Sequence, residues 1–513
     1  MKTSSLILSL FFVSITNAQT TFQKSFNLFS YDNGTSIEQT SDGGFIIGGY
    51  AGDTPYDIKA CLIKTNAAGD INWIRYFGGS NLYYGWSARE TSDGGFILSG
   101  WIDSLGSSNS NVYVVKTNVN GVLEWSKTYD IANNDRGICI RETSDAGFII
   151  CGVNWPVGFS LTILDLIKID STGDVEWMKN YYQTADIGFG QALYVIQTTD
   201  GGFMVTGFMN NGAGLLKTDS VGNVEWMKTY GDADWSTVAR EVCQTSDGGY
   251  VAAGYTFVNF GDQDLFLFRT NASGDTLWTK TFNHGIVEEI HSLKVTSDGG
   301  IILCGGSVDS TVNSDAVLVK TDSAGSIQWS RRYSLPLCND EGYSVWQTAE
   351  GGYVFSGVHD SIADHIYFVK TDENGNSFCY DSTINFVEVN HSIFVDSPTL
   401  VVTTGISQSV PNTLISSGGT DFTYCFVTGE QAPASDESVV IFPNPFTDFA
   451  IITFKHQGNF DFSLYNLLGQ RVLNSGNQST KLEIDRSNIS SGIYFYRVEE
   501  KGKVVASGKL IAE

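Results

Sequence analysis

The sequence is poor in basic residues, and this shortage excludes one class of partner. Lysine and arginine together number 30 against 56 aspartate and glutamate residues, so the formal net charge is −26 at pH 7. Proteins that bind a nucleic-acid backbone, or dock on an anionic membrane by charge, depend on lysine and arginine. We therefore expect no nucleic acid and no anionic membrane surface among the partners.

Long apolar runs are almost absent. The run LILSLFFVSI at 6–15 follows a positive start at Met1-Lys2 and is too short to span a bilayer. The next residues, TNA, end at Ala18 with small residues at the expected cleavage positions, so residues 1–18 are predicted to be a signal peptide. No cysteine lies directly after this apolar run, so we expect no lipoprotein anchor. No later apolar run is long enough to predict a transmembrane helix. We expect the mature chain to leave the cytoplasm.

Proline is scarce, with 8 residues, whereas glycine reaches 55 and aromatic residues make up 13%. Disordered chains lack aromatics, so this composition indicates a folded, turn-rich protein. A chain of 513 residues is too long for one small core and predicts either several domains or a large repeat domain with additions.

One short turn recurs at intervals of 47 to 55 residues, and it decides the predicted fold. TSDGGF and its variants place an acidic residue at Asp42, Asp93, Asp145, Asp200, Asp247, Asp298 and Glu350. Around each copy lie four short strand patterns separated by glycine, asparagine and aspartate turns, with no helical periodicity. Seven repeats of four strands predict an all-β, seven-bladed β-propeller. A β-solenoid is the alternative, but its repeats are shorter.

The third copy of the turn differs from the others. It reads TSDAGF and has Ala146 in place of the first glycine, whereas the second glycine is present in all seven copies. Because glycine tolerates positive φ and alanine does not, this pattern predicts that the second glycine has positive φ. The aspartate is interpreted as an exposed residue that forms the turn.

The last strand of each repeat reads aromatic, any, cation, any, aromatic, as in Trp73-Arg75-Phe77. The seventh repeat lacks this strand, but Phe22-Lys24-Phe26 has the pattern with no blade before it. Residues 22–26 are therefore predicted to supply the outer strand of the last blade, within a propeller over residues 19–378. Residues two apart share a face, so the pattern is either a stacking platform for a ligand or a blade-to-blade contact. Its recurrence at equivalent places favours the contact.

The segment KTDSVGNVEW at 217–226 resembles the tryptophan-docking motif of quinoprotein propellers. The resemblance implies that an acidic residue, a glycine and a tryptophan lock neighbouring blades. Here the spacings from the aspartate are one residue shorter, and the resemblance to these propellers is distant. No quinone site is visible, so no cofactor is expected.

Sequence motifs for catalysis or metal binding are weak. The six histidines are scattered, and no nucleophile elbow, HExxH helix or phosphate loop is present. We expect no catalytic residue and no metal site, and we expect a noncatalytic propeller that binds an extracellular glycan or protein. The loops that vary between repeats are the expected place for a ligand, with the nonrepeated Trp101, Trp155 and Trp235 as weak candidates for contact. The alternative is a polysaccharide-active hydrolase or lyase whose carboxylates converge at the mouth of the channel.

The region after the last repeat has a different pattern. Residues 379–436 are predicted to be a β-rich connector ending in a polar linker, and Cys379 and Cys425 are predicted to form a disulfide, which the export route allows. Residues 437–513 alternate strands and glycine turns, which predicts a small β-sandwich.

The final module resembles the type A C-terminal sorting domain of type IX secretion cargo. The matching residues are Pro443-Asn444-Pro445, Tyr465-Asn466, Gly469-Gln470-Arg471, Ser491-Gly492-Ile493-Tyr494 and Gly508-Lys509-Leu510. The resemblance implies passage through the periplasm and across the outer membrane of a Gram-negative bacterium, with the translocon reading the sorting domain. It also implies cleavage near 428–440 by a sortase-like peptidase, then release or attachment to surface lipopolysaccharide.

Overall fold

The computed structural model describes residues 20–105, 109–155, 162–182, 190–209, 212–231, 236–259, 261–308, 313–335, 338–360, 364–389, 394–397, 400–405, 407–409, 414–416, 420–427, 439–442, 446, 449–454, 458–466, 471–477, 480–486, 489–490, 492–500 and 503–512. The chain forms two compact units. One is Gln19–Val427 and the other contains Thr428–Glu513. The predicted signal peptide lies outside the described residues.

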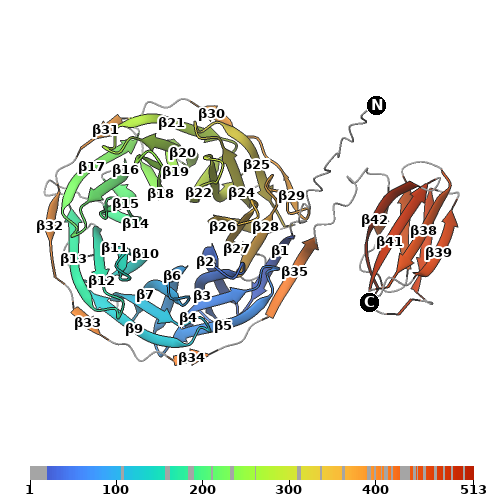
Figure 1. Cartoon of the computed structure of the whole chain (residues 1–513), viewed down its shortest axis with the longest axis horizontal. Helices are drawn as coiled ribbons and strands as arrows, with labels where there is room; N and C mark the ends of the chain where they lie inside the picture. The colour runs from blue at the N-terminus through green and yellow to red at the C-terminus, as the bar shows by residue number, and fades with distance from the viewer. Residues whose placement is uncertain are drawn as a thin grey trace, which may run out of the picture. The chain divides into compact units, whose positions relative to one another are not determined.

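The first unit is a ring of seven antiparallel four-stranded sheets (Figure 1). The predicted seven-bladed propeller is therefore confirmed. The innermost strands are β2 (Tyr31–Gln39), β6 (Leu82–Glu90), β10 (Arg136–Glu142), β14 (Gly190–Gln197), β18 (Thr237–Gln244), β22 (Val287–Val295) and β26 (Asn339–Gln347). The second strands are β3 (Phe45–Gly52), β7 (Phe96–Asp103), β11 (Phe148–Asn154), β15 (Phe203–Met209), β19 (Tyr250–Asn259), β23 (Ile301–Val308) and β27 (Tyr353–Asp360).

The outer half of each blade completes the sheet. The third strands are β4 (Ile58–Thr65), β8 (Ser110–Thr117), β12 (Ile163–Ile169), β16 (Gly212–Thr218), β20 (Asp262–Thr270), β24 (Ser314–Thr321) and β28 (Asp364–Thr371). The fourth strands are β5 (Ile71–Gly78), β9 (Leu123–Asp130), β13 (Val175–Tyr182), β17 (Val224–Gly231), β21 (Thr276–Asn283), β25 (Ile327–Tyr333) and, for the last blade, β1 (Thr21–Asn27). Blades are numbered 1 to 7 from β2, so blade 7 consists of β26, β27, β28 and β1.

The two ends of the repeat region meet in blade 7. β1 pairs antiparallel with β28, with Phe22 opposite Lys370 and Phe26 opposite Ile366. β2 of blade 1 packs against β26 and β27, and Ile37 N donates to Ser344 Oγ at 3.2 Å. The ring is thus joined through both its inner and its outer strands.

The recurring turn corrects one expectation. The first glycine has positive φ, as in Gly43 at 82°, and Ala146 takes the same conformation at 63°. The second glycine is required for space, since a Cβ on Gly44 would lie 2.1 Å from Thr65 O. Our assignment of positive φ to the second glycine was therefore wrong: alanine tolerates the conformation, and the crowding is what excludes a side chain.

The repeated aspartate does more than form the corner. Asp42 Oδ1 accepts hydrogen bonds from Thr40 Oγ1 at 2.6 Å and from Gly44 N at 3.0 Å. Lys64, whose side chain is buried, donates to both oxygens of Asp42 at 2.9 Å. The turn therefore anchors the third strand of its own blade, which supports a structural role for this motif.

The aromatic and cationic outer-strand pattern packs blade against blade. Trp125 in blade 2 lies over Gly173 in the turn of blade 3, where a Cβ would be 2.9 Å from the indole. Tyr129 OH donates to the carbonyl of the same glycine at 2.8 Å, and Lys127 pairs with Asp174 at 2.8 Å. Tyr181, Tyr230 and Tyr333 make the equivalent hydrogen bonds to Gly222, Gly274 and Gly375. The pattern is therefore a contact between blades.

The connector forms a belt around the outside of the ring (Figure 1). Each of its seven strands adds a fifth, antiparallel strand to the outer edge of one blade, in the order 6, 5, 4, 3, 2, 1 and 7. The strands are β29 (Asp381–Thr383), β30 (Val387–Val389), β31 (Phe394–Asp396), β32 (Val401–Thr403), β33 (Ser407–Ser409), β34 (Leu414–Ser416) and β35 (Thr420–Val427). Because an open edge strand invites unwanted pairing, the belt protects all seven edges.

The second unit is the predicted small β-sandwich. One sheet has the order β36 (Val439–Phe442), β37 (Phe449–Phe454), β40 (Lys481–Asp485), and the other has β39 (Arg471–Asn477), β38 (Phe460–Tyr465), β41 (Gly492–Glu500), β42 (Lys503–Ala512). Alternate residues such as Ile452, Phe454, Phe460 and Phe462 face a common core, as the period of a strand requires. Within the described ranges, no helix has the length and apolarity needed to cross a membrane.

Candidate functional site: the central channel

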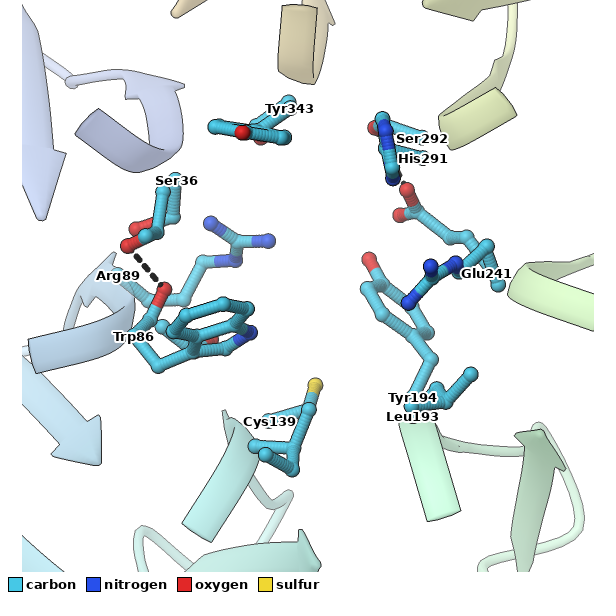
Figure 2. A pocket seen from close by; sticks show the side chains of 15 residues that line it. Ser36, Trp86, Arg89, Cys139, Leu193, Tyr194, Glu241, His291, Ser292 and Tyr343 are labelled. Atoms are coloured by element: carbon cyan, nitrogen blue, oxygen red, sulfur yellow. Dashed lines mark hydrogen bonds between the residues drawn. The ribbon is translucent and has the colours of Figure 1, made fainter. Parts of the chain in front are cut away.

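Every inner strand carries a β-bulge at the same repeat position. The hydrogen-bond register shifts by one residue there, and the extra residue is Thr35, Trp86, Ile138, Leu193, Arg240, His291 or Tyr343 in blades 1 to 7. All seven line one cavity of about 130 Å³ at the centre of the ring. Bulges redirect side chains and are common beside functional sites. Figure 2 shows Trp86 and Arg89 from blade 2, Tyr194 from blade 4 and Tyr343 from blade 7 around this space.

The residue after each bulge links neighbouring blades around the channel. Ser36 Oγ accepts from Ala88 N at 2.9 Å, and Ser292 Oγ accepts from Val345 N at 3.2 Å. In blade 5 the position is Glu241, whose Oε2 accepts from Leu293 N at 3.0 Å. These residues therefore belong to the frame of the cavity, while the bulge residues give it chemical variety.

Two cations contact the Glu241 and Tyr194 side chains of the cavity wall. Lys294 forms a close ion pair with Glu241 and lies over the ring of Tyr194 at 5.6 Å. Burial opposes ionisation of Glu241, but the Lys294 ammonium and the hydrogen bond from Ser292 outweigh it and hold its pKa below the usual value. Arg141 also lies over this phenol ring, 4.3 Å from its centroid.

A second cluster lies at the bulges of blades 5 to 7. The Glu289 carboxylate is 3.8 Å from Arg240 Nη2 and 3.7 Å from His291 Nε2. Burial and the nearby Arg240 charge lower the pKa of His291 to about 3, so the imidazole is neutral at pH 7. Tyr343 packs edge-on against that imidazole at 5.1 Å, and its hydroxyl donates to Glu341 at 2.7 Å.

The tryptophans named from the sequence have different surroundings. Trp101 in β7 is 7% exposed and stacks on Tyr84 at 5.0 Å, with Arg136 over it at 4.8 Å. The half-buried Trp155 receives the same guanidinium at 5.3 Å. Trp235 lies outside the described residues. Trp101 and Trp155 therefore join one cation–aromatic cluster beside the channel, and their role as ligand contacts stays a prediction.

The other predicted site residues are the two cysteines of the disulfide and the residues of the sorting module. Cys379 is disulfide-bonded, six other cysteines are free thiols, and the side chain of Cys425 lies outside the described residues. In the sorting module, Arg471 and Gly492 are exposed and Tyr494 is buried. Pro443, Asn444, Pro445 and Gly469, and the side chain of Lys509, lie outside the described residues. Among the residues that are described, no cluster of three potential metal ligands is present.

The bulge residues were missed from the sequence, although a signal was present. The ligand was expected at the loops that vary between repeats, whereas the inner strands line the cavity. The aligned repeats place Gly34, Gly85, Gly137 and Gly342 directly before four of the bulge residues. The next position holds a different residue in every repeat, and such variation within a repeated frame is the sign of a site.

The last module of the chain is identified by comparison. Residues 440–513 match the family described as the secretion system C-terminal sorting domain. The module therefore marks the chain for type IX export across the periplasm, to the cell surface or into the medium, and for interaction with the type IX machinery. No curated protein matches the chain.

Solved structures show distant likeness to about two thirds or more of the chain. The extracellular domain of the hybrid two-component system BT3049 from B. thetaiotaomicron is 13% identical with a TM-score of 0.40, over 95% of this chain and 57% of its own length. PorZ, a surface component of the type IX system of Porphyromonas gingivalis, is 9% identical with a TM-score of 0.28, over 94% and 81%. The polysaccharide lyase Uly1 is 10% identical with a TM-score of 0.43, over 66% and 90%. The chain thus spans little more than half of the first of these proteins, and the likenesses concern an all-β fold.

Proposed function

We propose that the exported propeller is a noncatalytic module that binds an extracellular glycan or protein in its central cavity. The observation that carries this proposal is the set of seven bulge residues. They occupy one repeat position, range from aliphatic to aromatic and cationic, and line a single cavity. A concave site with a few converging polar and aromatic groups is the usual form of a ligand site.

The carboxylates of the cavity argue against glycoside hydrolysis. A glycosidase needs two carboxyl groups, one of which must be protonated to act as an acid. Among the described residues that line the cavity, Glu241 is the sole carboxylate. Its ion pair with Lys294 and its lowered pKa keep it charged, so it is a poor proton donor.

The alternative is a hydrolase or lyase, and one observation favours it. His291 is a neutral imidazole that lines the cavity next to Arg240, as a general base beside a cation would. If this alternative holds, the wild-type protein will release products from a polysaccharide and His291→Ala will lose that activity while keeping ligand affinity. Absence of product from every glycan that binds contradicts it.

A glycan and polysaccharide array probed with the purified exported protein tests the binding proposal. We expect selective binding that Trp86→Ala weakens at least tenfold, because Trp86 is half-buried at the cavity wall. Trp73→Ala, which alters a contact between blades, is the matched control and should leave affinity unchanged. A ligand that binds both variants as tightly as wild type lies elsewhere on the protein.

For the sorting module we propose the partners that its family implies. A sortase-like peptidase of the type IX system of a Gram-negative bacterium removes it near residues 428–440, and the released propeller unit is secreted or attached to surface lipopolysaccharide. Mass spectrometry of the C-terminal peptide of the extracellular protein tests this. A protein that still ends at Glu513 outside the cell contradicts the cleavage.

A further inference from the structure

Arg89 faces the cavity, and Arg141 on the neighbouring blade contacts Ser87 and Tyr194, which line it. Arg89 in β6 is 7% exposed, lines the cavity and makes one hydrogen bond, from Nη1 to Ala88 O at 2.7 Å. Arg141 in β10 donates through Nη1 to Ile140 O at 2.6 Å and to Ser87 Oγ at 3.3 Å. Its Nη2 is buried and has no hydrogen-bond partner among the described residues. Figure 2 shows the guanidinium of Arg89 extending toward the middle of the cavity.

The acidic groups nearby are engaged elsewhere. Glu241 forms its ion pair with Lys294, although its charge also raises the pKa of Arg141. Glu38, at the repeat position of Arg89, accepts the backbone N–H of Glu90 at 3.0 Å. Within the described part of the chain, neither Arg89 nor Arg141 forms an ion pair. Burial raises the pKa of the Cys139 thiol, but a hydrogen bond with Cys151 and the charges of Arg141 and Arg89 outweigh it and lower that pKa.

Buried charges are normally paired, because removing an ion from water is costly without a compensating charge. A guanidinium offers a planar set of donors that matches a carboxylate or sulfate group. Two of them with free donors, inside a protein whose net charge is −26, form a local anion site that the acidic exterior does not predict. The missing partner of this site is therefore an oxyanion.

We propose that Arg89 and Arg141 bind the carboxylate or sulfate of an acidic sugar at the end of a glycan chain. This inference rests on the proposed binding function of the cavity. Trp86 and Tyr194 line the same cavity and offer apolar surface to a sugar ring. A cavity of about 130 Å³ suits a single end group better than a longer segment of a polymer.

Isothermal titration of the full exported protein tests the inference with four probes at constant ionic strength. These are glucuronate, N-acetylglucosamine 6-sulfate, neutral glucose and inorganic sulfate. We expect an acidic sugar to bind at least tenfold more tightly than glucose, with Arg89→Gln weakening it at least tenfold and Arg89→Lys less. Lys59→Gln, which removes the same charge from the third strand of blade 1, is the matched control and should bind as wild type.

The titration distinguishes a failure of the acidic-sugar proposal from a failure of glycan binding in the cavity. Tighter binding of the 6-sulfate assigns a sulfate ester, and tighter binding of glucuronate assigns a carboxylate. Equal affinity for glucose and the acidic sugars, or affinity unchanged in Arg89→Gln, overturns the inference and leaves glycan binding intact. Binding of inorganic sulfate alone overturns the recognition of a sugar. Thermal unfolding of each variant, expected to match wild type within a few degrees, shows that a loss of binding is not a loss of fold.

Discussion

Lys24 Nζ lies 2.8 Å from Asp70 Oδ1, and this ion pair joins blade 7 to blade 1. The lysine side chain is 1% exposed, whereas the aspartate is 60% exposed. Beside the pair, Phe22 packs its ring over Gly69 and lies 4.8 Å from the ring of Phe368. The N-terminal strand therefore closes the ring through the same kind of contact that joins the other blades.

Phe22→Ala should lower the free energy of unfolding by about 3–5 kcal/mol, because it leaves a cavity at a fully buried aromatic site. Denaturant titration followed by tryptophan fluorescence measures the change. Phe394→Ala, at a 61% exposed position of the belt, is the control and should change stability by less than about 0.5 kcal/mol. Equal effects of the two substitutions would show that the closing strand contributes no special stability.

The alanine in the third turn gives a prediction of the opposite sign. Ala146 has φ of 63°, a conformation that strains a residue with a Cβ. Ala146→Gly should therefore stabilise the protein by about 0.5–1 kcal/mol, the relief of strain being partly offset by the greater freedom of glycine in the unfolded chain. The same denaturant titration measures it.

Gly44→Ala is the contrasting substitution. Its Cβ would meet Thr65 O at 2.1 Å, so it should destabilise the protein more than Gly43→Ala, which meets no atom within 4 Å. If Gly43→Ala costs more than Gly44→Ala, conformational strain outweighs crowding in this turn.

The number of blades could be predicted because side chains carry the repeat. Asp42 and Lys64, or Trp125 and Tyr129, recur wherever the same contact is needed, and their spacing is visible in one chain. The belt could not be predicted in the same way. Strands such as β30 and β31 are three residues long and attach to the blades through backbone hydrogen bonds, which any side chain permits.

The cavity was hidden for a related reason. A bulge adds one residue to a strand without changing the apolar pattern on either side, so Trp86 and His291 read as ordinary strand residues. Arg89 and Arg141 lie on neighbouring blades, and which side chains come together across blades depends on how the blades pack. The sequence pattern therefore predicts the blades of the propeller well but not the side chains that line its central cavity.

Stability should be greatest in mildly acidic solution. Partial burial opposes ionisation of Asp93, but hydrogen bonds from Lys116 and Thr91 outweigh it and lower its pKa to about 2. A lowered carboxyl pKa gives stability above the unfolded value near 4, which is lost as the pH falls toward 2. Burial instead raises the pKa of Asp32 and Glu288 to about 7. These two groups bind a proton more tightly when folded, so their contribution is lost as the pH rises from about 4 to 7.

Thermal unfolding between pH 2 and pH 8 should thus show a maximum near pH 4–5. Asp32→Asn removes one titrating group while keeping an oxygen for the Leu28 and Phe29 N–H groups. Its melting temperature should fall less than that of wild type between pH 5 and pH 8. A steady rise in wild-type stability up to pH 8 would contradict the raised pKa values.

The belt should be fastened by a disulfide between Cys379 and Cys425. Thr21 and Gln23 both donate to Ser377, and Gln23 lies opposite Cys425 in the pairing of β1 with β35. The two ends of the belt therefore meet at the same strand. A nonreducing peptide map should contain one linked peptide with these two cysteines, and Cys379→Ser should lower stability by about 2–4 kcal/mol. Cys61→Ser, at a buried free thiol, is a control that leaves the linked peptide in place; a linked pair made of any other cysteines refutes the assignment.

Deleting residues 437–513 should leave the protein in the periplasm. The deletion removes the sorting domain at 440–513 and leaves the compact unit Gln19–Val427 complete. The propeller should therefore keep its fold but lack the signal for type IX export. Fractionation of cells into periplasm, surface and medium, with detection by an antibody against the propeller, measures the effect. Phe449→Ala is a matched point variant, since this 45% exposed residue lies outside the sandwich core and its loss should permit export. Surface delivery of the truncated protein at the wild-type level would show that the propeller or belt carries an export signal of its own.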